Sequence, residues 1–89
     1  MKSEMDESMK ILFFGRLGDQ LGRELEIEPP QSGCTVAELR QILCARGDAF
    51  RDTLGHPSVR GCVDQVIVPE DTPVRPDQEV AFIPPLSGG

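Results

Sequence analysis

Only one segment of this sequence has the full pattern of an amphipathic helix, and strand-like segments lie on both sides of it. Thr35 and Glu38 form a capping box, in which each side chain can bond the backbone N–H of the other residue. Apolar residues then recur at helical spacing, which predicts a helix over 35–46 that ends at Gly47. The buried stripe is expected to comprise Val36, Leu39, Ile42 and Leu43. The side chains expected to face water are those of Arg40, Gln41 and Arg46.

Short apolar or alternating runs predict strands before and after this helix. Residues 9–14 and 23–28 read as a hairpin, because glycines at 15, 18 and 22 indicate turns between them. Residues 59–63, 65–68 and 79–83 read as three further strands, whereas 48–56 is ambiguous and is compatible with one helical turn around Phe50 and Leu54. The order β-β-α-β-β-β predicts an α+β fold, with a sheet packed on one main helix.

The length of 89 residues allows one domain, which we divide into three parts. Residues 1–8 are polar and are expected to be a disordered extension, 9–83 form the folded domain, and 84–89 form a tail. No apolar run is long enough to span a bilayer, and residues 1–8 do not resemble a signal or transit peptide. We therefore expect a cytoplasmic protein that does not act at a membrane.

Charge and cysteine spacing exclude several classes of function. The net charge of −6 and the four aromatic residues, all phenylalanine, argue against nucleic-acid binding and favour a basic protein surface as partner. The three cysteines contain no CxxC pair, and there is one histidine, so we expect neither a metal site nor a disulfide framework.

Two of the predicted strands are apolar on both faces. In 9–14, Leu12 and Phe14 point to the side opposite Ile11 and Phe13, and in 79–83 Ala81 and Ile83 lie opposite Val80 and Phe82. One helix can cover only one face of the sheet, so loops or a partner protein must cover the other. The low core capacity of a small chain slightly favours a partner.

The last six residues are the strongest chemical signal. Two terminal glycines occur by chance roughly once in 200 chains, and a frayed terminus explains them if they are taken alone. Pro84 and Pro85 stop the last strand and favour a stiff, extended exit, which aims Leu86, Ser87, Gly88 and Gly89 away from the sheet. Residues without a Cβ can enter a narrow channel, so the Gly89 carboxylate could react in another protein's active site. No internal catalytic constellation competes with this hypothesis.

These segments resemble the small subunit of molybdopterin synthase, a family of ubiquitin-like β-grasp sulfur carriers. The resemblance covers nearly all of 9–89 and is carried by residues 10–14, the helix, 62–65 and above all the terminal Phe-Ile-Pro-Pro-Leu-Ser-Gly-Gly. It departs from the family pattern at Asp64, Ile83, Gly18 and Asp19.

The resemblance implies a non-catalytic subunit whose tail carries sulfur. A ubiquitin-activating-like adenylyltransferase would consume ATP to adenylate Gly89, and the resulting thiocarboxylate would donate sulfur to the cyclic pyranopterin precursor in a large catalytic subunit. The carrier would itself bind no cofactor, and the assembly would be a heterotetramer. Residues implied to bind the partner are Phe14, Ile67, Ile83, Pro84, Pro85, Leu86, Ser87 and Gly88. The alternatives are a carrier for another product such as thiazole, a ubiquitin-like modifier of other proteins, and an interaction domain with an idle tail.

Overall fold

The computed structural model describes residues 8–28, 30 and 33–84. The disordered extension predicted over 1–8 therefore lies outside the described residues except for Ser8, and the predicted tail lies outside them except for Pro84.

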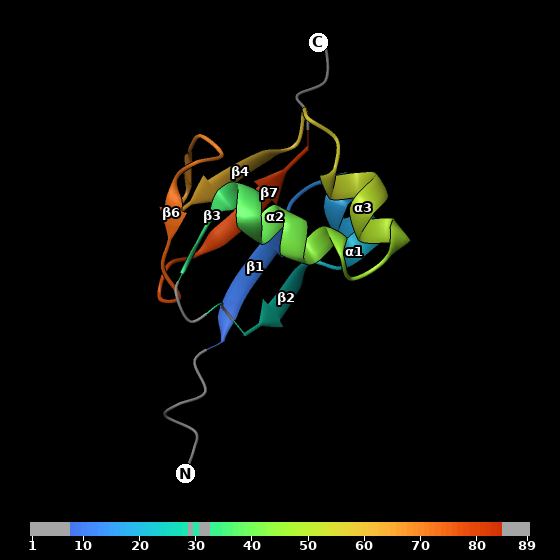
Figure 1. Cartoon of the computed structure of the whole chain (residues 1–89). Coiled ribbons are helices and arrows are strands. Elements are labelled where there is room, and N and C mark those ends of the chain that lie inside the picture. The colour runs from blue at the N-terminus through green and yellow to red at the C-terminus, as the bar shows by residue number, and fades with distance from the viewer. Residues whose placement is uncertain (1–7, 29, 31–32, 85–89) are drawn as a thin grey trace.

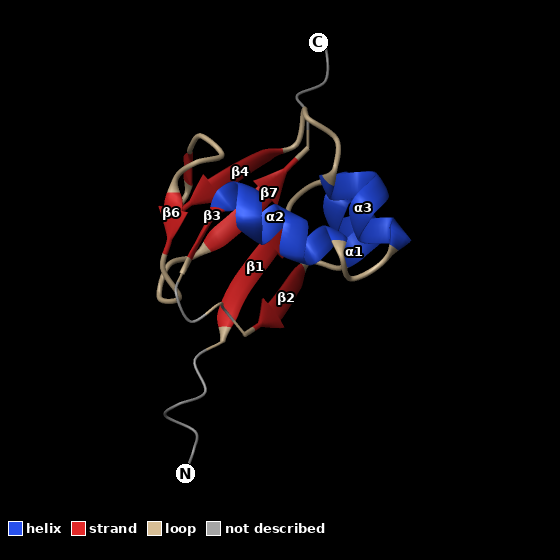
Figure 2. Cartoon of the chain, in the orientation of Figure 1, coloured by secondary structure: helices blue, strands red, loops and turns tan. Residues whose placement is uncertain are grey.

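A mixed five-stranded sheet forms one layer of the molecule (Figure 2). Its strands are β1 (Met9–Phe13), β2 (Glu24–Ile27), β4 (Arg60–Val63), β5 (Val66–Ile67) and β7 (Val80–Ile83), in the order β2-β1-β7-β4-β5. The first and last strands are parallel neighbours, and the other neighbours are antiparallel. A separate ladder pairs β3 (Cys34–Thr35) with β6 (Pro73–Val74). The predicted α+β class and the antiparallel pairing of the first two strands are confirmed, although α1 (Arg16–Leu21) lies between these strands.

Three helices lie on one side of this sheet (Figure 1). They are α1 (Arg16–Leu21), α2 (Val36–Cys44) and α3 (Asp48–Leu54). The core between helices and sheet contains fully buried side chains from both layers, including Met9, Ile11, Leu39, Leu43 and Phe82. Among the described residues, no helix combines the length and apolar character needed to cross a membrane.

The predicted main helix is present with both bonds of its capping box. The Thr35 N–H donates to Glu38 Oε1 at 2.9 Å, and the Glu38 N–H donates to Thr35 Oγ1 at 3.2 Å. Gly47 does not end this helix: α2 stops at Cys44, with Ala45 as its C-cap, and Gly47 precedes α3. Ile42 was placed in the buried stripe, but it is 39% exposed.

Arg40 does not face water as predicted. Its side chain is only 14% exposed, because the guanidinium donates to the backbone carbonyls of Leu54 and Val59 and to both carboxylate oxygens of Glu70. It also lies over the Phe82 ring, 5.4 Å from the centroid. The long aliphatic stem lets arginine leave the helix face and join three segments through one cation.

Two more helices form than the pattern indicated. The glycine-rich stretch predicted as turns contains α1, which buries Leu17, and 48–56 contains a seven-residue helix rather than one turn. The sheet is therefore packed on α2 together with two short helices, not on one helix alone. Glycine spacing hid α1, because Gly15 and Gly22 have positive φ and stand just outside its two ends while Gly18 lies within it.

Candidate functional site

The sheet face opposite the helices carries a continuous apolar row. Strand pairing places Leu12 beside Ala81, Ala81 beside Cys62, and Cys62 beside Ile67. Paired residues share a face of a sheet, so the row crosses β1, β7, β4 and β5 on the side that no helix covers. We call this side the uncovered face. The predicted two-sided apolarity of the first and last strands is thereby explained.

The three sheet residues predicted to bind a partner all belong to the uncovered face. Phe14 is 47% and Ile67 54% exposed, while Ile83 is half-buried. Phe14 continues the pairing of β1 with β7, since its N–H donates to the carbonyl of Phe82 at 3.1 Å. This bond brings Phe14 alongside Ile83 at the end of β7. The arrangement is that of a small docking surface with exposed apolar anchors.

Polar residues lie next to the apolar row, towards the other end of the strands. Lys10 pairs with Glu26 across the β1–β2 ladder. Asp64 and Glu79 bond each other through the backbone, and the Glu79 N–H also donates to Asp64 Oδ1 at 3.1 Å. An apolar centre with a polar rim is the usual anatomy of a protein–protein contact.

The buried thiols of Cys34 and Cys62 are not activated as nucleophiles. Burial raises the pKa of the Cys62 thiol, and burial followed by the nearby Glu38 carboxylate raises the pKa of Cys34. Both thiols therefore stay protonated at neutral pH, whereas a nucleophile or metal ligand needs the thiolate. Within the described part of the chain, no three His, Cys, Asp or Glu side chains gather as a metal site would require.

The root of the tail is held against the turn between β1 and α1. Gly15 has a φ of +59°, and a Cβ at this position would lie 3.0 Å from Cγ of Pro84. The glycine thus permits both the backbone angle and the close approach of Pro84. Of the tail residues predicted to bind a partner, only Pro84 can be placed; Pro85, Leu86, Ser87, Gly88 and the predicted reactive Gly89 lie outside the described residues.

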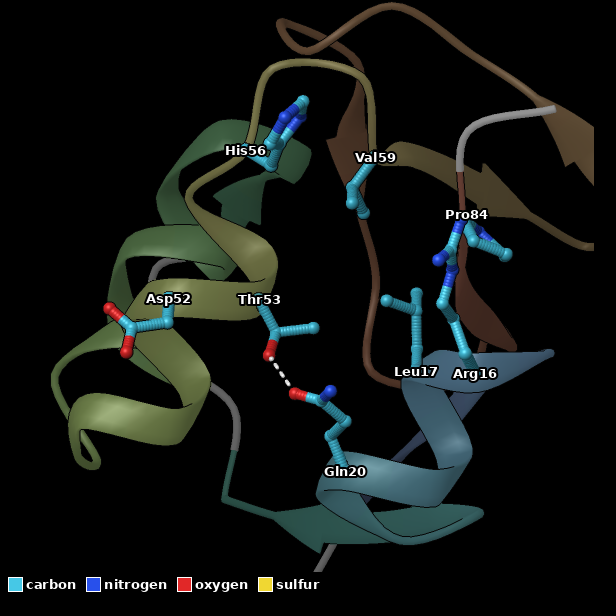
Figure 3. A pocket seen from close by; sticks show the side chains of 8 residues that line it. All are labelled: Arg16, Leu17, Gln20, Asp52, Thr53, His56, Val59 and Pro84. Carbon is cyan, nitrogen blue, oxygen red and sulfur yellow. Dashed lines mark hydrogen bonds between the residues drawn. The ribbon is translucent and has the colours of Figure 1, made fainter. Parts of the chain in front are cut away.

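A cavity of about 290 Å³ lies beside the root of the tail (Figure 3). Its walls come from α1, α3, the loop after α3, and Pro84. Because α1 was not predicted from the sequence, this cavity was not predicted either. Thr53 Oγ1 donates to Gln20 Oε1 at 3.1 Å across it. His56 is an exposed loop residue, and its Nδ1 accepts a bond from the Ser58 N–H at 3.1 Å. These contacts do not assemble a nucleophile and a base.

Sequence comparison decides the family. Residues 11–89 match the ThiS family. The chain belongs to this family. It is 33% identical over 81 residues to the molybdopterin synthase sulfur carrier subunit of Escherichia coli strain K12, a match covering 91% of this chain and 99% of that protein. The corresponding subunit of Haemophilus influenzae is 26% identical over the same shares of the two chains.

Solved structures place this ThiS-family chain in the β-grasp fold. SAMP1 from Haloferax volcanii superposes with a TM-score of 0.73 at 20% identity, covering 92% of this chain and 99% of SAMP1. A putative molybdopterin converting factor subunit 1 from Pyrococcus furiosus gives 0.73 at 24% identity, covering 89% and 98%. A complex of subunits 1 and 2 of molybdopterin-converting factor from Helicobacter pylori gives 0.63 at 20% identity, covering 92% and 99%. The predicted ubiquitin-like β-grasp is confirmed.

Proposed function

We propose that this chain is the sulfur carrier subunit of a molybdopterin synthase and that the Gly89 carboxylate is the group that carries the sulfur. The observation that supports this most is the 33% identity to the Escherichia coli carrier over 91% of the chain. The match to the ThiS family also runs through Gly89.

The proposed chemistry activates a poor electrophile and then stores sulfur on it. A carboxylate oxygen of Gly89 attacks the α-phosphorus of ATP on an adenylyltransferase, and pyrophosphate leaves. Hydrosulfide attacks the carbonyl carbon of this mixed anhydride, AMP leaves as the C–S bond forms, and loss of the S–H proton gives the thiocarboxylate. The thiocarboxylate sulfur is then a soft nucleophile for the pyranopterin precursor, and its tether gives it a high effective concentration in the partner's site.

The uncovered face binds the large subunit in this proposal. Phe14 and Ile83 lie on that face at the end of β7, and Pro84 follows directly, so docking there leads the tail into the partner. The large subunit supplies the catalytic residues, because the described part of the chain holds no catalytic constellation of its own. We expect two carriers and two large subunits in the assembly, and we place the carrier in the cytoplasm, where its free thiols stay reduced.

Intact-protein mass spectrometry tests the proposal. The carrier is incubated with its adenylyltransferase, ATP and a sulfide source, and then given to the large subunit with the cyclic precursor. We expect one oxygen to be replaced by sulfur, and then restored as molybdopterin forms. A variant lacking Gly89 should do neither, yet should bind the large subunit like the parent.

Two results would overturn this assignment. One is molybdopterin synthesis that continues at the parental rate when a residue is added after Gly89, which would show that the terminus is idle. The other is a charged carrier that transfers nothing to the precursor and instead forms isopeptide conjugates or supplies thiazole synthesis.

A further inference from the structure

A hollow of about 400 Å³ opens beside Phe14, where the uncovered face meets α1. The hollow is lined by the end of β1 and the two residues after it, by one side of α1, and by the start of β2: Leu12, Phe13, Phe14, Gly15, Gly18, Asp19, Arg23 and Glu24. The hollow is therefore continuous with the surface that the proposed function assigns to the large subunit. A side chain projecting from that partner could enter it without any change in the backbone.

Gly18 packs closely against the backbone at the end of β1. A Cβ added to Gly18 would lie 3.0 Å from the backbone carbonyl oxygen of Phe13, and its next neighbours would be atoms of Arg23 at 3.8 Å. A larger residue at this position would therefore press on the end of β1. The hollow beside Phe14 is open to a group from outside the chain.

Two carboxylates stand at the mouth of the hollow. Asp19 is exposed and forms no ion pair with any described residue. Glu24 lies opposite Leu12 in the β1–β2 ladder and so projects on the uncovered face. Its contact with Lys10 is loose, 3.7 Å between Oε1 and Nζ with both side chains more than half exposed. An exposed pair of this kind holds its partners weakly.

The cation in the lining does not neutralise this pair. Arg23 directly precedes β2, and its carbonyl accepts a bond from the Phe13 N–H at 3.0 Å, so its Cβ starts on the side of the core-facing Phe13 rather than on the side of Glu24. No carboxylate of the described residues lies within ion-pair distance of it. The uncovered-face side of the hollow thus combines an apolar wall with two carboxylates, in a chain whose net charge is −6.

We propose that this hollow receives one basic side chain, an arginine or lysine, from the large subunit. The aliphatic stem packs on Leu12 and the ring of Phe14, and the cationic head lies between Asp19 and Glu24. Long basic side chains bind such sites well, because they bury their methylenes and keep the charge near carboxylates and an aromatic face. The inference rests on the proposed function, because it takes the large subunit as the partner.

Calorimetric titration of the large subunit with carrier variants tests the hollow. Asp19→Asn and Glu24→Gln each remove one charge and keep the shape of the side chain. Asp71→Asn is the matched control, since Asp71 is also exposed but lies in the loop before β6. At low salt we expect each hollow variant to bind about tenfold more weakly than the parent, and the control to stay within about twofold. The difference should shrink at high salt, where the charges are screened.

The possible results distinguish a failure of this inference from a failure of the proposed function. If the parent binds and both hollow variants stay within about twofold of it, the basic side chain is refuted while the assignment as sulfur carrier stands. Equal losses in the control would also refute it, because the effect would then come from total charge. A parent carrier that gains sulfur on Gly89 but does not bind the large subunit would overturn the partner and the hollow together.

Discussion

Replacing Phe14 with alanine removes the most prominent ring from the uncovered face. Phe14 is 47% exposed, and a phenylalanine side chain can bury about 150–250 Å², so about 70–120 Å² remains for a partner to cover. At about 25 cal/mol per Å², this area corresponds to about 2–3 kcal/mol of binding free energy. Alanine keeps the Cβ, so we expect a loss of about 2 kcal/mol, or about 30-fold in Kd.

The matched control is Ile42→Ala. Ile42 is 39% exposed, but it lies on α2 in the helical layer, away from the uncovered face. Both variants remove a partly exposed apolar group, so their free energies of unfolding should fall by similar, small amounts. Calorimetric titration with the large subunit then measures the interface, and urea unfolding of each variant confirms that the fold is retained.

Two results of these titrations would refute the assignment of the uncovered face as the docking surface. If Phe14→Ala binds within about threefold of the parent, the area calculation describes a surface that no partner covers. If Ile42→Ala weakens binding as much as Phe14→Ala, then the helical layer takes part, and the uncovered face is not the specific docking surface.

Four further changes test other parts of the structure. Ile83→Asp should weaken binding of the large subunit by about 3 kcal/mol or more in the same titration, because the contact would bury an unpaired charge. Arg40→Gln should lower the free energy of unfolding in urea by about 2–3 kcal/mol, since two backbone carbonyls lose their donors, whereas Glu70→Gln should cost less than about 1 kcal/mol. Gln65→Gly should raise the melting temperature, because Gln65 has a φ of 71° in the turn between β4 and β5 and glycine relieves about 1 kcal/mol of strain. Burial raises the pKa of the Cys62 thiol above its ordinary value of 9.0, so on titration to high pH the unfolded chain loses this proton before the folded chain does. The melting temperature should therefore fall as the pH rises past 9.0, and Cys62→Ala should reduce that fall.

Local signals predicted the parts of the fold that depend on neighbours in sequence. The capping box fixed the start of α2, because Thr35 and Glu38 lie within one turn of each other. Alternation in the first and last strands predicted an uncovered apolar face, since side chains on a strand alternate whatever they pack against. Phe14, which this alternation places on that face, is 47% exposed.

Contacts between segments that lie far apart in the sequence could not be predicted from local sequence patterns. The exposure of Arg40 was wrongly predicted because its partners Leu54, Val59 and Glu70 are 14 to 30 residues away along the chain. The helix α1 was missed because its stability comes from burying Leu17 against the core rather than from propensity, and glycine at Gly18 lowers propensity further. The hollow beside Phe14 depends on α1 and was missed with it.

Parallel pairing of the first and last strands brings the proposed docking surface and the root of the tail to the same place. Because β1 and β7 run in the same direction, both finish at the same end of the sheet, where the Phe14 N–H donates to the carbonyl of Phe82 and Gly15 lies next to Pro84. The exposed Phe14 ring and the root of the tail thus directly follow two strands paired in one ladder. A partner that binds Phe14 is therefore also next to Pro84, the first residue of the tail. If β1 and β7 were antiparallel, their C-terminal ends would lie at opposite ends of the sheet, and Phe14 would be separated from the root of the tail.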